Sequence, residues 1–296
     1  MRVVILGSDT PLGVALVAHL EALERHELTL MSLSACRWKS ERQAKKSIVR
    51  AKSALCVDLR IEAAGYGGLQ IQETDLKRTH WVAKACQRTE TGYLYVSSSR
   101  VFSGELDRPY AETDLPDNEE TIGQLLARAE ELVRGCERHL VLRMGPVFSH
   151  EGTNLVTQLL GPLQEGDSLI MDNNLRGSPV AASDGARVIS GLLDQISTGL
   201  EPWGVYHYGS SDTATYFEFA EALLAAASQF SDFGSSAVQL EKESEGMPPR
   251  DRTLECGKIR DVFAIRQVPW RGAIGDLVKH YFDNLAEERT HGQVNG

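Results

Sequence analysis

The chain has 296 residues, a formal net charge of −10, and 42% apolar and 24% charged residues. These fractions are typical of a folded globular protein, and the negative charge argues against nucleic-acid binding, which needs clustered Lys and Arg. No apolar run approaches the roughly 20 residues that span a bilayer, and the opening MRVVILGSDT lacks the features of a secretory signal. We therefore expect a cytoplasmic protein without membrane contact. Five scattered cysteines predict reduced thiols and no metal site.

Strand-like and helix-like segments alternate through the first half of the chain. The β-branched and apolar runs predict strands at 2–6, 27–33, 53–59, 92–99 and 139–148. Helical periodicity predicts helices at 11–23, 73–89 and 119–135. Such alternation favours a Rossmann-like α/β fold, a doubly wound parallel sheet with helices on both faces.

After residue 150 the alternation is less regular. Helices are predicted near 153–165, 183–198 and 215–228, with short strands at 167–171 and 204–209 around a loop at 172–183. We expect residues 1–150 to form a dinucleotide-binding core. Residues 151–296 should form mostly a smaller substrate-type lobe, with elements returning to the core. The polar tail from Glu287 onward is expected to fray.

The turn after the first strand is the place where this fold would bind a nucleotide. Glycines let the backbone approach a pyrophosphate, and the following helix offers free N–H groups. The candidate cofactor-binding residues in the turn are Gly7, Asp9, Thr10, Pro11, Leu12 and Gly13. Alternatively, Asp9 or Thr10 is only the N-cap of a helix that begins at Pro11. The negative charge of Asp9 opposes a phosphate, whereas Thr10 is compatible with both uses.

The end of the second predicted strand bears on cofactor choice. A site that prefers NAD places a carboxylate there, on the ribose hydroxyls. This chain has Ser34 and Arg37 instead, so a bound dinucleotide should be NADP rather than NAD. The basic stretch at 37–52 either helps to favour NADP over NAD or is simply the solvated face of a helix.

Residues 95–130 resemble a known family. Ser97–Gly104, SSSRVFSG, is similar to the S-T-D-Y-V-F-x-G segment of the dTDP-4-dehydrorhamnose reductases, and Pro109–Asp114 to their P-Y/W-x-E-x-D segment. These proteins are extended short-chain dehydrogenases, and their relatives include the regulatory subunit of S-adenosylmethionine synthetase. Residues 204–223 and 251–259 resemble later segments of the family. The resemblance covers nearly the whole chain and implies binding of NAD(P) and of a sugar nucleotide.

The resemblance also identifies two departures in the helix at 119–135. The family helix begins Y-G-x-[ST]-K-x-x-G-E, in which the Tyr transfers a proton at the substrate oxygen and the Lys lies one turn later on the same face. Gly123 and Glu130 match this pattern, but Ile122 stands at the Tyr position and Leu126 at the Lys position. The apolar face of this helix is expected to carry no group that transfers a proton. Ser98 remains at the position of the catalytic Thr.

Two further segments have lost polar residues that the family carries. The N-A-A segment that lines the cofactor falls near Val57–Asp58–Leu59. The substrate-lobe loop D-Q-x-G-x-P-T resembles residues 174–180, where the shape-determining Gly and Pro remain. The candidate residues of that loop are Arg176, Gly177, Ser178 and Pro179.

The sequence therefore predicts a non-catalytic, reductase-like protein with two open roles. It binds NADP(H) or a nucleotide sugar weakly as a sensor, with no cofactor required, or it acts as a regulatory subunit of a partner enzyme or a homo-oligomer. The competing hypothesis is an NADP-dependent reductase or epimerase of a nucleotide-linked sugar with another proton donor. His80 and Lys84 are the candidates for that donor, although both also fit ordinary surface positions.

Overall fold

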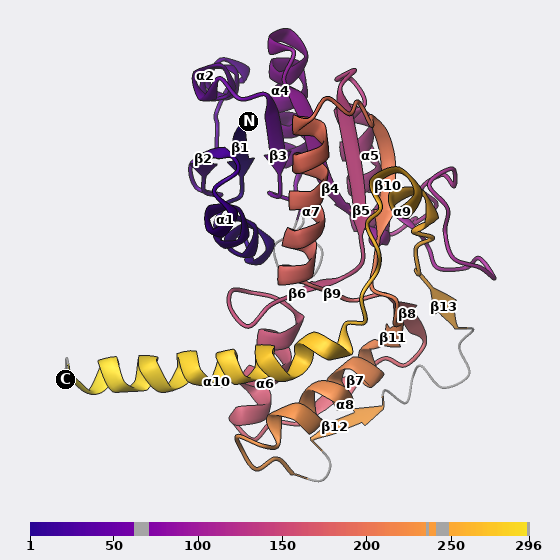
Figure 1. Ribbon diagram of the computed structural model, residues 1–296. Helices are drawn as coiled ribbons and strands as arrows, with labels where there is room; N and C mark the ends of the chain where they lie inside the picture. Colours follow the sequence, from indigo (N-terminus) through magenta and orange to yellow (C-terminus); the bar gives the residue numbers. More distant parts are fainter. Residues whose placement is uncertain (62–70, 235–236, 241–248, 295–296) are drawn as a thin grey trace.

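The computed structural model describes residues 1–61, 71–234, 237–240 and 249–294. Its centre is a six-stranded, fully parallel sheet with the strand order β10-β5-β4-β3-β1-β2 (Figure 1). The strands are β1 (Arg2–Leu6), β2 (Glu27–Met31), β3 (Leu55–Asp58), β4 (Gly92–Ser98), β5 (His139–Met144) and β10 (Gly204–Tyr208). The order reverses between β1 and β3, so the predicted doubly wound, Rossmann-like fold is confirmed.

Helices cover both faces of this sheet. One pair packs on the front of the view in Figure 1, and three helices pack behind it. The front helices are α1 (Pro11–Leu23) and α7 (Ala182–Ser197), and those behind are α2 (Glu41–Ala51), α4 (Glu73–Thr89) and α5 (Thr121–Val133). The short α9 (Gly257–Phe263) packs against β10 and α7. The four strands β1, β3, β4 and β5 are almost fully buried, as a parallel sheet between helical layers requires.

A second, smaller lobe lies below the sheet in Figure 1 and has its own hydrophobic core around Phe148, Phe219 and Trp270. Its helices are α6 (Leu155–Gln164), α8 (Tyr216–Ala227) and α10 (Arg271–Val294). Its short strands pair as β6 (Val147–Phe148) with β9 (Val180–Ala181), β7 (Leu169–Met171) with β12 (Val238–Leu240), and β8 (Leu175–Gly177) with both β11 (Ala214–Thr215) and β13 (Arg250–Asp251). The second half of the chain also returns β10 and α7 to the main sheet.

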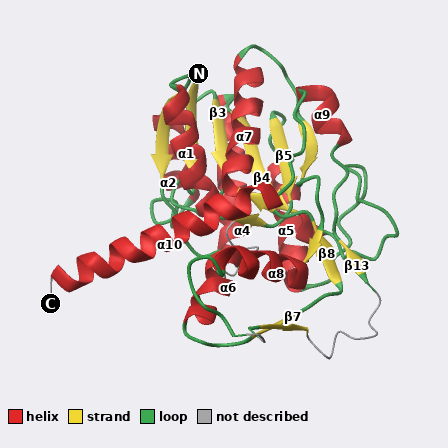
Figure 2. Cartoon of the chain, turned by 60° about the horizontal axis from the view of Figure 1, so that its bottom comes forward, coloured by secondary structure: helices red, strands yellow, loops and turns green. Residues whose placement is uncertain are grey.

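Three expectations about local structure were wrong. The predicted strand 139–148 is two strands, β5 and β6, separated at Gly145, where a Cβ would lie 1.8 Å from the Ser178 carbonyl oxygen. The predicted loop 172–183 contains β8 and β9. The tail expected to fray from Glu287 continues as helix α10 to Val294, which projects from the body in Figure 2.

The cysteines match the expectation of reduced thiols, because all five are free and buried. Within the described ranges, no helix has the length and apolar character needed to cross a membrane.

Candidate functional site

The turn between β1 and α1 lies at the carboxyl edge of the sheet. Thr10 caps α1, because its Oγ1 accepts the Gly13 N–H at 3.0 Å and donates to the Gly7 carbonyl at 2.9 Å. Pro11 is the first helical residue. Gly7 has a φ of +80°, and a Cβ on Gly13 would lie 2.2 Å from the Gly7 oxygen. Both glycines are therefore required by the turn itself, with or without a nucleotide.

Asp9 ties this turn to the loop after β2. Its Oδ1 accepts the Leu33 N–H at 2.6 Å. Ser34 and Arg37 lie exposed on the same loop. The Asp9 carboxylate would oppose the phosphates of a dinucleotide at this turn in charge. The preference for NADP through Ser34 and Arg37 stays a prediction.

A buried ion pair that the sequence analysis missed lies beside the turn. Asp58, at the end of β3, accepts from Arg60 Nε at 2.9 Å and from Arg60 Nη2 at 2.7 Å. The Tyr93 hydroxyl donates to the same carboxylate at 2.7 Å, and the Trp38 ring centre lies 5.5 Å from the guanidinium carbon. A Cβ on Gly7 would lie 3.1 Å from the Arg60 backbone nitrogen. Arg60 thus borders the Gly7 turn directly after residues 57–59, the positions matched to the family's N-A-A segment. In the sequence, only the D-x-R spacing could have indicated this ion pair.

Helix α5 carries the two positions at which the family has its Tyr and Lys. Leu126 is 1% exposed and belongs to the main hydrophobic core, and Ile122 is partly buried against the same core. A Cβ on Gly123 would lie 2.5 Å from the Asn118 side chain, so this glycine allows α5 to approach the preceding loop. The structure therefore gives Ile122 and Leu126 a packing role.

Glu130, which matches the family pattern, lies fully buried on the inner face of α5. Arg143 of β5 donates to the Glu130 carboxylate through Nε at 2.9 Å and Nη2 at 2.7 Å, and Ser97 donates to it at 2.7 Å. Arg143 Nη1 also lies 3.3 Å from Nε2 of His207, whose Nδ1–H donates to the Tyr110 carbonyl at 3.0 Å. Burial, and then the charge of Arg143, lower the pKa of His207 to about 3. The network joins β4, α5, β5 and β10 through internally paired groups.

Two hydroxyls close to the end of β4 serve local structure. Ser98 is buried, and its Oγ accepts the Arg100 N–H at 3.2 Å. Tyr110 stacks on Phe102 with ring centres 4.0 Å apart, and its hydroxyl accepts the Gly104 N–H at 2.9 Å. Tyr110 is fully buried, so its hydroxyl holds the loop that follows η1 (Ser99–Val101).

The alternative proton donors lie on α4. Lys84 Nζ is 3.6 Å from the Glu41 carboxylate of α2, so this side chain faces α2 rather than α5. His80 is half-buried on the same helix. The structure does not bring either residue together with Ser98, Ile122 or the Gly7 turn through any described hydrogen bond or ion pair.

A small cavity lies between the two lobes and opens to solvent. Three of the four predicted loop residues line it, namely Arg176, Gly177 and Pro179, whereas Ser178 is buried beside it. Arg176 Nη2 is held by Glu218 at 2.9 Å. The lining residues that the sequence analysis missed include Ser99, directly after β4, and Arg252, after β13.

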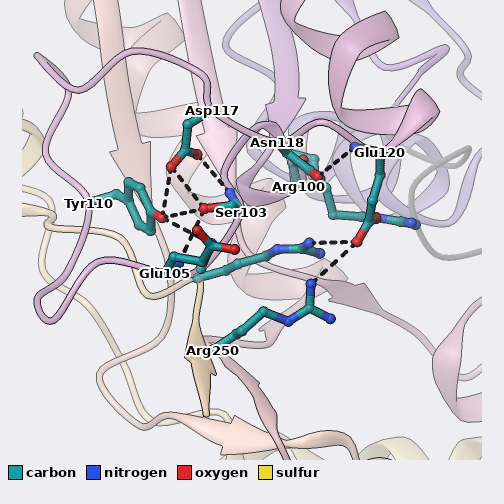
Figure 3. Close-up of polar contacts among 11 residues, drawn as sticks. Arg100, Ser103, Glu105, Tyr110, Asp117, Asn118, Glu120 and Arg250 are labelled. Carbon is teal, nitrogen blue, oxygen red and sulfur yellow. Dashed lines mark hydrogen bonds and ion pairs between the residues drawn. The ribbon is translucent and has the colours of Figure 1, made fainter. Parts of the chain in front are cut away.

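A cluster of charges, several of which are labelled in Figure 3, includes the cavity-lining Arg252. Arg252 Nη2 lies 3.3 Å and Arg250 Nη1 lies 3.6 Å from the same oxygen, Oε1 of Glu120, at the start of α5. Burial acts to raise the pKa of Glu120, but the charges of Arg252, Arg100 and Arg250 together lower it. In a chain with net charge −10, this is a local concentration of positive charge.

Comparison with known proteins agrees with this geometry. A family model described as "RmlD substrate binding domain" matches residues 1–282. The spore coat polysaccharide biosynthesis protein SpsK of Bacillus subtilis is 26% identical over 176 residues, which are 56% of this chain and 60% of that protein. The dTDP-4-dehydrorhamnose reductase of Aggregatibacter actinomycetemcomitans is 22% identical over 291 residues, 93% of this chain and 98% of the relative.

Solved structures show the same fold. The dTDP-4-dehydrorhamnose reductase of Bacillus anthracis, solved in complex with NADP, has a TM-score of 0.76 at 18% identity, over 94% of this chain and 98% of that one. With the family match spanning nearly the whole sequence, this chain belongs to the RmlD substrate binding domain family, among the extended short-chain dehydrogenases similar to dTDP-4-dehydrorhamnose reductase.

Proposed function

We propose that this chain binds a nucleotide ligand without performing the reduction after which its relatives are named. It would act as a sensor of that ligand or as a regulatory subunit. The observation that carries the proposal is Leu126, whose side chain lies in the main core at the position of the family Lys. With Ile122 at the Tyr position, α5 has no hydroxyl and no ammonium group at these two positions to move a proton to a substrate oxygen.

Neighbouring tyrosines do not supply a replacement proton donor. Tyr93 and Tyr95 of β4 are fully buried, and burial raises the pKa of both well above the ordinary value. Tyr93 is also hydrogen-bonded to Asp58. A phenol that is removed from solvent and harder to ionise is a poor acid–base catalyst at neutral pH.

The cavity between the lobes supports a phosphate-bearing ligand. It is lined by two arginines, Arg176 and Arg252, whose guanidinium groups complement phosphate oxygens. The name of one relative is that of a nucleotide-sugar reductase, and one solved neighbour is a complex with NADP, which supports these two ligand classes. We assign the nucleotide sugar to the cavity between the lobes and NADP(H) to the Gly7 turn. The turn should bind NADP(H) weakly, because Thr10 crowds the approach and Asp9 repels phosphate. Each of these residues should lower affinity about fivefold to tenfold.

Calorimetric titration with NADPH and NADH tests this proposal. Wild type should bind NADPH weakly and in preference to NADH. The double change Asp9→Ala with Thr10→Gly should tighten the binding of NADPH, and Ser8→Ala is the matched control in the same turn. Arg37→Ala should reduce the difference in affinity between NADPH and NADH. If the wild type and the double variant both fail to bind at millimolar concentration, the sensor role falls. Only the role of a subunit, for a partner enzyme or a second copy, would remain.

A further inference from the structure

The backbone around Arg250 and Arg252 is firmly held. The amides of Arg250 and Arg252 donate to the carbonyls of Asn174 and Arg176, at 2.8 and 2.9 Å. On the other side, a Cβ on Gly104, which has a φ of +91°, would lie 3.0 Å from the Arg250 Cβ. This segment therefore lies between strand β8 and the Gly104 turn, so the starting points of both arginine side chains are fixed before any ligand arrives.

Arg252 has unused hydrogen-bonding capacity. Its side chain is 6% exposed, and its buried Nε has no partner among the described residues. A guanidinium has five N–H donors, and a buried polar group without a partner is costly. Because Arg252 lines the cavity between the lobes, an anion in that cavity could use these donors.

Glu120 is the anion that both arginines contact. It is the N-cap residue of α5, yet its carboxylate makes no capping hydrogen bond to the helix. Both guanidinium groups instead approach one of its oxygens. Figure 3 shows this contact for Arg250. The Glu120 side chain is 43% exposed, so it can move into water at little cost.

We propose that Arg250 and Arg252 form a binding site for the phosphoryl groups of a diphosphate ligand, in which Glu120 is an internal competitor that the ligand displaces. Two guanidinium groups match the geometry and charge of phosphate oxygens better than those of a single carboxylate oxygen. Displacement would also break the contact between β13 and the start of α5, so that ligand binding would be sensed at the first turn of this helix. The identity of the natural ligand at Arg250 and Arg252 rests on the proposed function, whereas the phosphoryl-binding site itself does not.

Calorimetric titration with inorganic pyrophosphate at low ionic strength tests the site. Glu120→Gln should tighten pyrophosphate binding about threefold to tenfold, because the competing charge is gone. Glu119→Gln, an exposed neighbour, should leave the affinity within about twofold of wild type. Arg250→Gln should weaken binding by at least about fivefold. This position is preferred to Arg252 because its side chain is 40% exposed and its replacement should not disturb folding.

An unchanged affinity in Glu120→Gln, or full pyrophosphate affinity in Arg250→Gln, would overturn the inference. Thymidine diphosphate, titrated in parallel, should show the same dependence on residues 120 and 250. Tighter pyrophosphate binding by Glu120→Gln, together with no binding of NADPH or nucleotide sugar by wild type, would support this site and refute the proposed function.

Discussion

Substitution of Leu126 by Lys tests whether the α5 position is part of the core. The side chain is 1% exposed, so the new ammonium group would lose its water. Burial lowers a lysine pKa from about 10.4 by several units. Each unit by which the lysine pKa is lowered costs about 1.36 kcal/mol of folding stability at a pH below the folded-state pKa. If that pKa falls to about 7 or below, the loss at pH 7 corresponds to about three such units. We therefore expect a loss of about 3 to 5 kcal/mol, reduced where the side chain can reach solvent.

The assay is thermal unfolding of Leu126→Lys beside Gln124→Lys, an exposed position on the same helix. The first should lower Tm by about 6 to 20 °C and the second by at most about 2 °C. Because the folded-state pKa of the introduced lysine would be lowered, the penalty exists below the unfolded pKa and should shrink as the pH rises from about 7 toward about 10. Equal Tm values for the two variants would show that position 126 faces open space, which refutes the packing argument.

Two other perturbations follow from buried groups. The pKa of His207 is about 3 in the folded chain and about 6.5 in the unfolded chain. The neutral imidazole therefore contributes fully to the free energy of unfolding above pH 6.5, and this contribution is lost as the pH falls toward 3. Urea unfolding at pH 7, 6 and 5 should give wild type a slope steeper than that of His207→Gln by up to about 1.4 kcal/mol per pH unit; parallel slopes would contradict the neutral imidazole. Gly13→Ala should cost about 2 kcal/mol or more. Gly275→Ala, which meets open space in α10, should be neutral or stabilising by up to about 1 kcal/mol. Similar effects of the two alanines in the same unfolding assay would refute the close approach at Gly13.

Features fixed by neighbouring residues could be predicted from the sequence. Helix α4 has the predicted bounds 73–89, because its periodicity is joined by a local capping box between Gln72 and Asp75. The start of α1 was limited to two N-cap candidates, because Thr10 and Pro11 are adjacent. The parallel sheet followed from alternation alone.

Features set by distant contacts could not be predicted. The break between β5 and β6 depends on the approach of Gly145 to Ser178. The charge cluster joins Glu120 to Arg252, which is 132 positions away in the chain. The resemblance included Glu130 as a matching residue, but its burial against Arg143 depends on how α5 packs on the sheet.

Oxidation of NADPH in the presence of dTDP-4-dehydrorhamnose tests the central claim most directly. The account predicts that purified protein, followed by NADPH absorbance with related 4-keto sugars in parallel, shows no turnover above the protein-free rate. Ile122→Tyr with Leu126→Lys should not restore full activity, because the loop at 174–180 also differs from the family pattern. Wild-type turnover at about 1 s⁻¹, which is low for an ordinary enzyme, would contradict the account and establish a reductase with another proton donor.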